Sequence, residues 1–227
     1  LEMVAGGCDK DCHRRRFKTK LIAMGMCGYD RVLIEPSGIF DMDEFFDALH
    51  EEPLDRWYQI GNVIAVVDAG LDEKMSEEAD YILASEVADA GCIVLSKTQE
   101  ASEKSIEFTV KHLNRALEAV HCKRKFGEDE IIRKDWEQFE TEDFERILNS
   151  GYIAEDYEKM SLDEKEVFKS LYFMDLEISG EELRDAAQKI MQDPACGSVF
   201  RIKGFTQEAD GSWTELNATH HEITQCP

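Results

Sequence analysis

Short apolar runs that end in a polar turn constrain this chain more than any other feature. Residues 32–34 are followed by Glu35, residues 63–67 by Asp68, and residues 92–95 by Ser96. Runs of this length favour strands that are buried on both faces, and segments with helical spacing separate them. Strands that alternate with helices in this way predict right-handed βαβ crossovers and a mainly parallel sheet.

The segments between the runs carry helix signals. We expect helices over residues 12–26, 76–88 and 103–121, and a further helix that Asp41 caps and that ends near Pro53. In that further helix Phe45, Phe46 and Leu49 form an apolar face. The first half of the chain therefore predicts an α/β domain.

The second half has a different pattern. Residues 123–165 are rich in charge but carry scattered aromatics, which predicts a connector of short amphipathic helices. Beyond it we expect a strand over 168–178, a helix over 180–192 and strands over 197–206 and 213–223, with Asp210-Gly211 as a hairpin signal. This order predicts a small α+β domain with an antiparallel component.

Charge and composition exclude several classes of partner. The formal net charge is -23 and the pI is near 4.6, so nucleic acid and anionic membranes are not expected partners. No apolar run approaches the ~20 residues of a membrane span, and no secretory apolar region opens the chain. The seven cysteines, an odd number, suit reduced thiols. We expect a cytoplasmic protein.

The turn after the first run is a candidate site. In open parallel sheets ligands bind beyond the carboxyl ends of the strands, where Glu35, Ser37 and Gly38 are expected. A carboxylate there can hold a metal ion or its water, and Gly38 lets backbone N–H groups approach a phosphate oxygen. The alternative is an ordinary turn at the end of a strand.

Four segments, in order, resemble the CobW-type metallochaperone GTPases, P-loop proteins related to those that serve nickel insertion into hydrogenase and urease. Glu35-Pro-Ser-Gly38 resembles the E-x-x-G loop of that family, and Val66-Val-Asp68 resembles its strand that ends in Val-Asp-Ala. Residues 88–99 resemble A-D-x-I-V-L-N-K-T-D, the guanine-recognition loop, and residues 201–205 resemble R-x-K-G-F of its C-terminal domain.

The resemblance implies a mainly parallel P-loop NTPase-type sheet flanked by helices, with GTP and Mg²⁺ as ligands. It implies that Glu35 and Gly38 act at the Mg²⁺ and γ-phosphate region. It also implies nucleotide contacts from Ser37, Asp68, Ser96, Lys97 and Gln99. The implied domains are a partial GTPase-like domain over 1–122, the connector over 123–165 and a CobW C-terminal-like domain over 166–227.

The chain also departs from the family. It contains no G-x-x-x-x-G-K-[ST], the loop that cradles phosphates, so this segment alone is not expected to hydrolyse nucleotide. We expect that loop in an upstream piece, and the alternative is a degenerate relative. Ser96 replaces the usual Asn, and Gln99 replaces the Asp that reads guanine, while Lys97 is retained. Guanine selectivity is therefore an open question at this point.

A metal site is the second prediction from the resemblance. Cys8 and Cys12 lie where the family has G-C-x-C-C, a motif that binds Zn²⁺ or a similar ion, and His13 is adjacent. Two thiolates and an imidazole would supply three ligands of an open tetrahedral site for Zn²⁺ or Co²⁺. The alternative is a loop with two free thiols, which the neighbouring Lys10 and Arg14 favour because they repel cations.

Two functions follow as hypotheses. The first is a GTP-dependent metallochaperone or metal-cofactor insertion protein, for instance in cobalamin synthesis, with a nucleotide, a metal ion and a client protein as partners. The second is a non-catalytic binding or scaffold protein that keeps the fold without hydrolysis. The residues alone leave open whether the chain is part of an enzyme.

Overall fold

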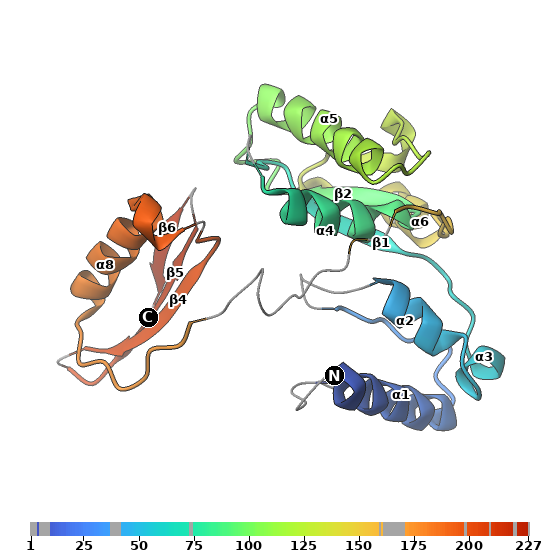
Figure 1. The fold of residues 1–227 in the computed structure, drawn as a ribbon, viewed down its shortest axis with the longest axis horizontal. Helices are drawn as coiled ribbons and strands as arrows, with labels where there is room; N and C mark the ends of the chain where they lie inside the picture. Colours follow the sequence, from blue (N-terminus) through green and yellow to red (C-terminus); the bar gives the residue numbers. More distant parts are fainter. Residues whose placement is uncertain are drawn as a thin grey trace. The chain divides into compact units, whose positions relative to one another are not determined.

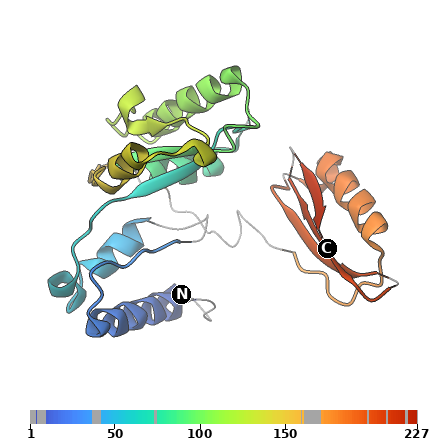
Figure 2. The same cartoon turned by 180° about the vertical axis from the view of Figure 1, so that it is seen from behind.

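The computed structural model describes residues 4, 10–36, 42–72, 75–158, 160, 171–197, 199–208, 210–219 and 222–226. The chain divides into two compact units, Leu1–Lys169 and Ser170–Pro227. Figure 1 labels the elements of both units, and Figure 2 shows them from behind. The finer division at residues 122 and 165 stays a prediction.

A parallel sheet forms the centre of the first unit. Its strands β1 (Ile64–Asp68), β2 (Cys92–Ser96) and β3 (Ile131–Ile132) lie in the order β1-β2-β3, and both pairings are parallel. In this register Asp68 lies opposite Ser96. The predicted parallel sheet is therefore confirmed, and the polar residues that follow β1 and β2 meet at the same edge of the sheet.

Helices cover this sheet. Helices α4 (Glu77–Ala88) and α5 (Glu103–Ala119) pack against each other, and the main apolar core lies between them and the sheet. Helix α6 (Thr141–Leu148) and the chain after it lie on the other face (Figures 1 and 2). On that face the thiol of Cys92 is close to the hydroxyl of Ser150, and burial raises the pKa of the thiol.

Serine caps explain why α4 and α5 start where they do. The hydroxyl of Ser76 accepts a hydrogen bond from the backbone N–H of Ala79, and that of Ser102 accepts one from Ser105. Each cap satisfies one of the four N–H groups that have no partner inside the first turn of a helix. These helices match the predicted ranges closely.

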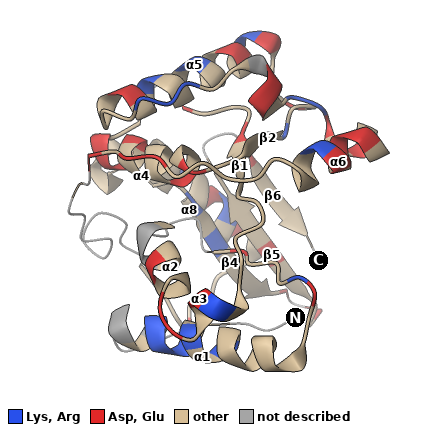
Figure 3. Cartoon of the chain, turned by 90° about the vertical axis from the view of Figure 1, so that its right-hand side faces the viewer, with Lys and Arg blue, Asp and Glu red and all other residues tan. Residues whose placement is uncertain are grey.

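Three further helices build a smaller core in the first unit. They are α1 (Lys10–Cys27), α2 (Met42–Leu49) and α3 (Leu54–Trp57), and Leu21, Leu49 and Leu54 are buried together. Two basic side chains of α1, a helix with a basic stretch that is blue in Figure 3, form ion pairs with the same carboxylate. Glu51 pairs with Lys18 at 2.7 Å and with Arg14, and the hydrogen bond from Lys18 contributes most to the lowered pKa of the Glu51 carboxyl.

The prediction of a first strand at residues 32–34 is wrong for this structure. Residues 31–36 lie in no strand, and the side chains of Leu33 and Ile34 are 86% and 38% exposed. A strand requires a neighbour to satisfy its backbone N–H and C=O groups, and within the described residues nothing pairs with this segment. The apolar run alone could not reveal that.

The second unit places one helix on an antiparallel sheet. Strands β4 (Ile202–Gln207), β5 (Trp213–Ala218) and β6 (Ile223–Cys226) pair in that order, and α8 (Gly180–Gln192) covers one face. Ala187, Leu216 and Ala218 form its core. Two predictions are corrected: residues 171–178 form no strand and are largely exposed, and the single strand expected over 213–223 is the β5–β6 pair.

Short 3-10 helices complete the fold. They are η1 (Glu128–Glu130), η2 (Trp136–Gln138) and η3 (Pro194–Cys196). The first two flank β3, inside the region that was expected to be only a helical connector. A search of the described helices found none that is both long and apolar enough to cross a lipid bilayer.

Candidate functional site

The carboxyl ends of β1 and β2 bring three predicted residues together. The ammonium group of Lys97 lies 2.6 Å from one carboxylate oxygen of Asp68, and the other oxygen accepts the backbone N–H of Gly70 at 2.8 Å. The hydroxyl of Ser96 donates to the carbonyl of Val67 at 3.3 Å. The parallel register thus makes one polar edge from two segments that are 29 residues apart.

The loop after β2 is a tight turn. Lys97 adopts φ 56°, the left-handed region, and its carbonyl accepts the N–H groups of Glu100 and Ala101. Ser102 then caps α5. A loop held by three such interactions keeps Thr98 and Gln99 in a fixed place relative to the sheet.

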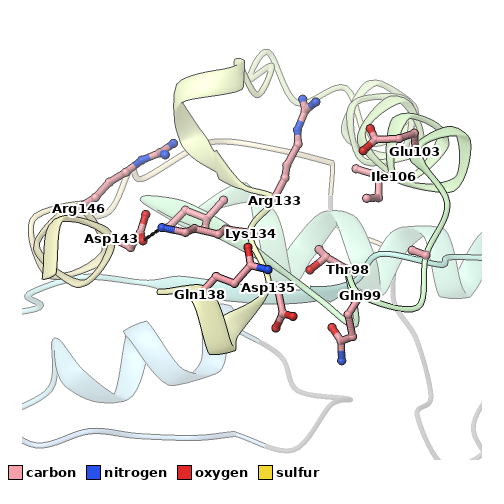
Figure 4. Close-up of a pocket in the computed structure, with 12 residues that line it drawn as sticks. Thr98, Gln99, Glu103, Ile106, Arg133, Lys134, Asp135, Gln138, Asp143 and Arg146 are labelled. Carbon is pink, nitrogen blue, oxygen red and sulfur yellow. Dashed lines mark hydrogen bonds and ion pairs between the residues drawn. The ribbon is translucent and has the colours of Figure 1, made fainter. Parts of the chain in front are cut away.

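A pocket of about 620 Å³ opens beside this loop, within the range of small-molecule sites. One wall is the loop and the first turn of α5, and the other is the chain from β3 through η2 to α6. Figure 4 shows the lining side chains. The polar ones that lie nearest the β2 loop in that view are Thr98, Gln99, Asp135 and Gln138.

An ion pair forms one end of the pocket. Lys134 donates to Asp143 at 2.7 Å and lies 3.5 Å from Glu140. The hydrogen bond to Asp143 raises the pKa of Lys134, and the pKa of Asp143 is lowered, first by the backbone N–H of Glu140 and then by Lys134. Asp143 is therefore a carboxylate whose charge is already balanced.

Asp135 is a pocket residue that sequence reasoning missed. It follows β3, whose pairing with β2 places it across the pocket from Gln99. One of its carboxylate oxygens accepts the N–H of Glu137 at 3.0 Å, so it caps η2. The signal was an apolar pair before a polar run, Ile131-Ile132 before Arg-Lys-Asp, but two residues are too few to predict a strand.

Two residues of the segment that resembles the guanine-recognition loop, Asp89 and Gly91, serve packing within the fold. Asp89 is only 5% exposed, and its carboxylate accepts the N–H of Glu155 at 3.1 Å. A Cβ on Gly91 would lie 2.2 Å from the carbonyl oxygen of Gly151, so only glycine allows this close approach. These two residues fix the chain that follows α6 against the start of β2.

The structure does not bring the remaining predicted residues that it describes to this edge. Glu35 is exposed and lies in no strand, while Ser37, Gly38 and Cys8 lie outside the described residues. Cys12 is partly buried in α1, next to His13, whose side chain also lies outside the described part. Among the described side chains no group of three or more histidine, cysteine or acidic residues could hold a metal ion.

A parallel sheet covered by helices, with a polar loop and a pocket at the carboxyl ends of its strands, defines the class of α/β proteins that bind ligands at this edge of the sheet. A sequence model described as the CobW/HypB/UreG nucleotide-binding domain matches residues 1–127. Because this match covers more than half of the chain, the protein belongs to the CobW/HypB/UreG family, a GTPase-type family. Searches of curated proteins and of solved structures returned no match.

Proposed function

We propose that this chain supplies the base-binding part of a GTP-dependent metal-handling protein. The observation that carries the proposal is the pocket beside the β2 loop, whose neighbour Lys97 is fixed by Asp68 at 2.6 Å. In this arrangement the purine enters between the β2 loop and η2. Lys97 borders this pocket without lining it, and the family resemblance gives its aliphatic stem the role of flanking the ring. Ser96 supports the turn that carries Gln99.

The motif that cradles phosphates in this family is not in residues 1–227. The sequence has no G-x-x-x-x-G-K-[ST], so its own contribution on the phosphate side is proposed to come from Glu35, Ser37 and Gly38 through Mg²⁺. The phosphate loop would come from another segment of the working protein. The chain as given is therefore expected to bind the nucleoside moiety and to hydrolyse nothing alone.

Saturation-transfer difference NMR on the purified chain tests this proposal. We expect guanosine and GTP to receive saturation mainly at the base and ribose protons, with affinities within a few-fold of each other and little dependence on Mg²⁺. The variant Lys97→Ala should weaken the binding of both guanosine and GTP. A matched change outside the pocket, Lys125→Ala, should not, because Lys125 is exposed and makes only a long ion pair with Glu118 at 3.6 Å.

A second candidate function is a non-catalytic binding or scaffold protein that keeps the fold without nucleotide hydrolysis. The substitutions at Ser96 and Gln99 favour it, because each removes a group that the family uses for the base. Absence of saturation transfer from the chain to any purine nucleoside would contradict the first proposal and leave this one.

The metal function is proposed from Cys8, Cys12 and His13. Co²⁺ added to the reduced chain should produce thiolate-to-cobalt charge-transfer absorption, and Cys8→Ser and Cys12→Ser should each abolish it. Cys27→Ser is the matched control, because Cys27 is an exposed thiol at the other end of the same helix. Equal absorption in all three variants would rule out this site.

A further inference from the structure

We infer that Asp135 supplies the carboxylate that reads the guanine edge in this pocket, in place of the residue at position 99. This inference rests on the proposed function, since it assigns the selectivity of the same pocket. It concerns a residue outside all four segments that carry the family resemblance.

Guanine presents two neighbouring donors, N1–H and the 2-amino group. A carboxylate accepts both at once, and its charge makes these hydrogen bonds roughly twice as strong as neutral ones. The amide of Gln99 has a single acceptor oxygen beside a donor NH₂ group, so it cannot receive both donors in the same way. The pocket therefore needs a carboxylate from elsewhere to select guanine.

Three carboxylates line the pocket, and two of them are poorly suited. Asp143 is committed to Lys134 at 2.7 Å and to the N–H of Glu140 at 2.9 Å. Glu103 lies at the first turn of α5, and in Figure 4 it is on the far side of Thr98 from Asp135. Asp135 and Gln99 project from the two walls toward the same side of the pocket (Figure 4).

The local backbone holds Asp135 in place. Its Oδ1 accepts the N–H of Glu137 at 3.0 Å, and its carbonyl accepts the N–H of Gln138 at 2.9 Å. Among the described residues this cap is the hydrogen bond that the carboxylate makes. Each carboxylate oxygen has two lone pairs, so Oδ2 and the second lone pair of Oδ1 can accept the two guanine donors. A carboxylate fixed before binding loses little side-chain entropy when the base arrives.

The sheet itself creates this arrangement. Ile132 lies opposite Val94 in the parallel β2–β3 register, so the chains that leave the two strands run out over the same edge. Gln99 lies three residues after the end of β2, beyond a tight turn, and Asp135 lies three residues after the end of β3. The two loops are thus the two walls between which a flat ring can lie.

The variant Asp135→Asn tests the inference with little disturbance of the fold, because Asn caps a helix about as well as Asp. Asparagine loses the charge and places an NH₂ donor where guanine also has donors. We expect the affinity for guanosine to fall about 10-fold or more. Xanthosine carries a carbonyl in place of the 2-amino group, so the xanthosine to guanosine affinity ratio should rise by a similar factor.

Competition in saturation-transfer difference NMR measures the affinities for guanosine, xanthosine and adenosine, and therefore the xanthosine to guanosine ratio. Asp156→Asn is the control, because it alters an exposed aspartate outside the pocket. Gln99→Ala tests the competing assignment to position 99: if Asp135 reads the base, this variant lowers the affinities for guanosine and xanthosine alike. Circular dichroism melting of Asp135→Asn should match that of the wild type.

The outcomes separate the two proposals. If the wild type binds guanosine and Asp135→Asn leaves the xanthosine to guanosine ratio unchanged, Asp135 does not read the base, while the proposed function stands. If the xanthosine to guanosine ratio changes in Gln99→Ala and not in Asp135→Asn, the residue that reads the guanine edge is Gln99. If no purine nucleoside binds the wild type, both proposals fail.

Discussion

Lys97 shows how a residue can fix geometry while adding little stability. Its side chain is 49% exposed and pairs with an Asp68 side chain that is 32% exposed. An ion pair with this much solvent around it contributes about 0–1 kcal/mol to folding. Its left-handed φ of 56° is mildly unfavourable for a residue with a Cβ. The value of the pair therefore lies in where it places the ammonium group and the turn that follows.

Gly91 is a residue whose replacement should destabilise the fold by a steric mechanism. A methyl group there would overlap the carbonyl oxygens of Gly151 and Ser150, at 2.2 and 2.4 Å. We expect Gly91→Ala to lower the free energy of unfolding by about 1–3 kcal/mol. Urea denaturation measures it against Gly61→Ala, where a Cβ would meet nothing within 4 Å. Equal midpoints for the two variants would contradict the close packing at Gly91.

Glu86 should make the stability of the protein depend on pH. Burial raises the pKa of this α4 carboxyl from 4.5 to about 7. Because the folded state binds the proton more tightly than the unfolded state, the contribution of Glu86 is fully present below pH 4.5. It is lost as the pH rises to 7 and above, by roughly 2–3 kcal/mol at most.

The measurement for Glu86 is the free energy of unfolding from urea titrations at pH 5.5 and 8.5. Glu86→Gln should reduce the difference between the two values. Glu77→Gln, which alters an exposed carboxyl on the same helix, should leave it as in the wild type. A wild-type difference that survives in Glu86→Gln would assign the dependence to other groups.

At the scale of elements, the end of α4 depends on one buried arginine. Arg124 is 7% exposed; it donates to the carbonyl of Ala88 at 2.6 Å, pairs with Glu130 at 3.0 Å and lies 4.2 Å over the ring of Phe126. The last carbonyls of a helix have no partner within it, so this guanidinium completes α4. It also ties α4 to the chain before β3.

We expect Arg124→Ala to cost about 3–5 kcal/mol of unfolding free energy, because it leaves a helix carbonyl and Glu130 without their partner. Arg124→Lys should restore only part of this, since one ammonium group cannot reproduce the fork of contacts. Thermal and urea unfolding compare both with Lys125→Ala, an exposed neighbour. A loss below 1 kcal/mol in Arg124→Ala would mean that the buried contacts are replaceable.

The elements also show what the sequence could and could not predict. Helices α4 and α5 were predicted nearly to the residue, because helix signals such as the serine caps at Ser76 and Ser102 are local. Strands depend on a partner that is distant in the chain. The runs at 32–34 and 168–178 carried strand-like residues but no pairing in the described part, whereas Ile131–Ile132 paired despite its length.

The same reasoning applies to the site. The edge formed by Asp68, Ser96 and Lys97 was predictable, because the carboxyl ends of neighbouring parallel strands must meet. The opposite wall was not, since it depends on β3 joining the sheet through only two residues. Asp135 was thus hidden in a segment that composition alone describes as a charged connector.

At the scale of the whole molecule, the two compact units have separate cores. Leu117 and Leu216 are both fully buried, one in each core. Leu117→Ala and Leu216→Ala should each lower local stability by about 2–5 kcal/mol. Hydrogen exchange followed by mass spectrometry should show faster exchange only within the unit that carries the substitution. Acceleration in both units from either variant would show that they unfold as one.

The three tryptophans of the chain are spread over its separately packed regions, at Trp57 in α3, Trp136 in η2 and Trp213 in β5, and each is about half exposed or more. Each region therefore carries its own fluorophore. Phenylalanine at any two of these positions leaves a single tryptophan, whose emission can be excited selectively over that of the tyrosines. In the variant that retains Trp136, the indole next to Asp135 should report occupancy of the pocket through quenching or a blue shift, without an added dye.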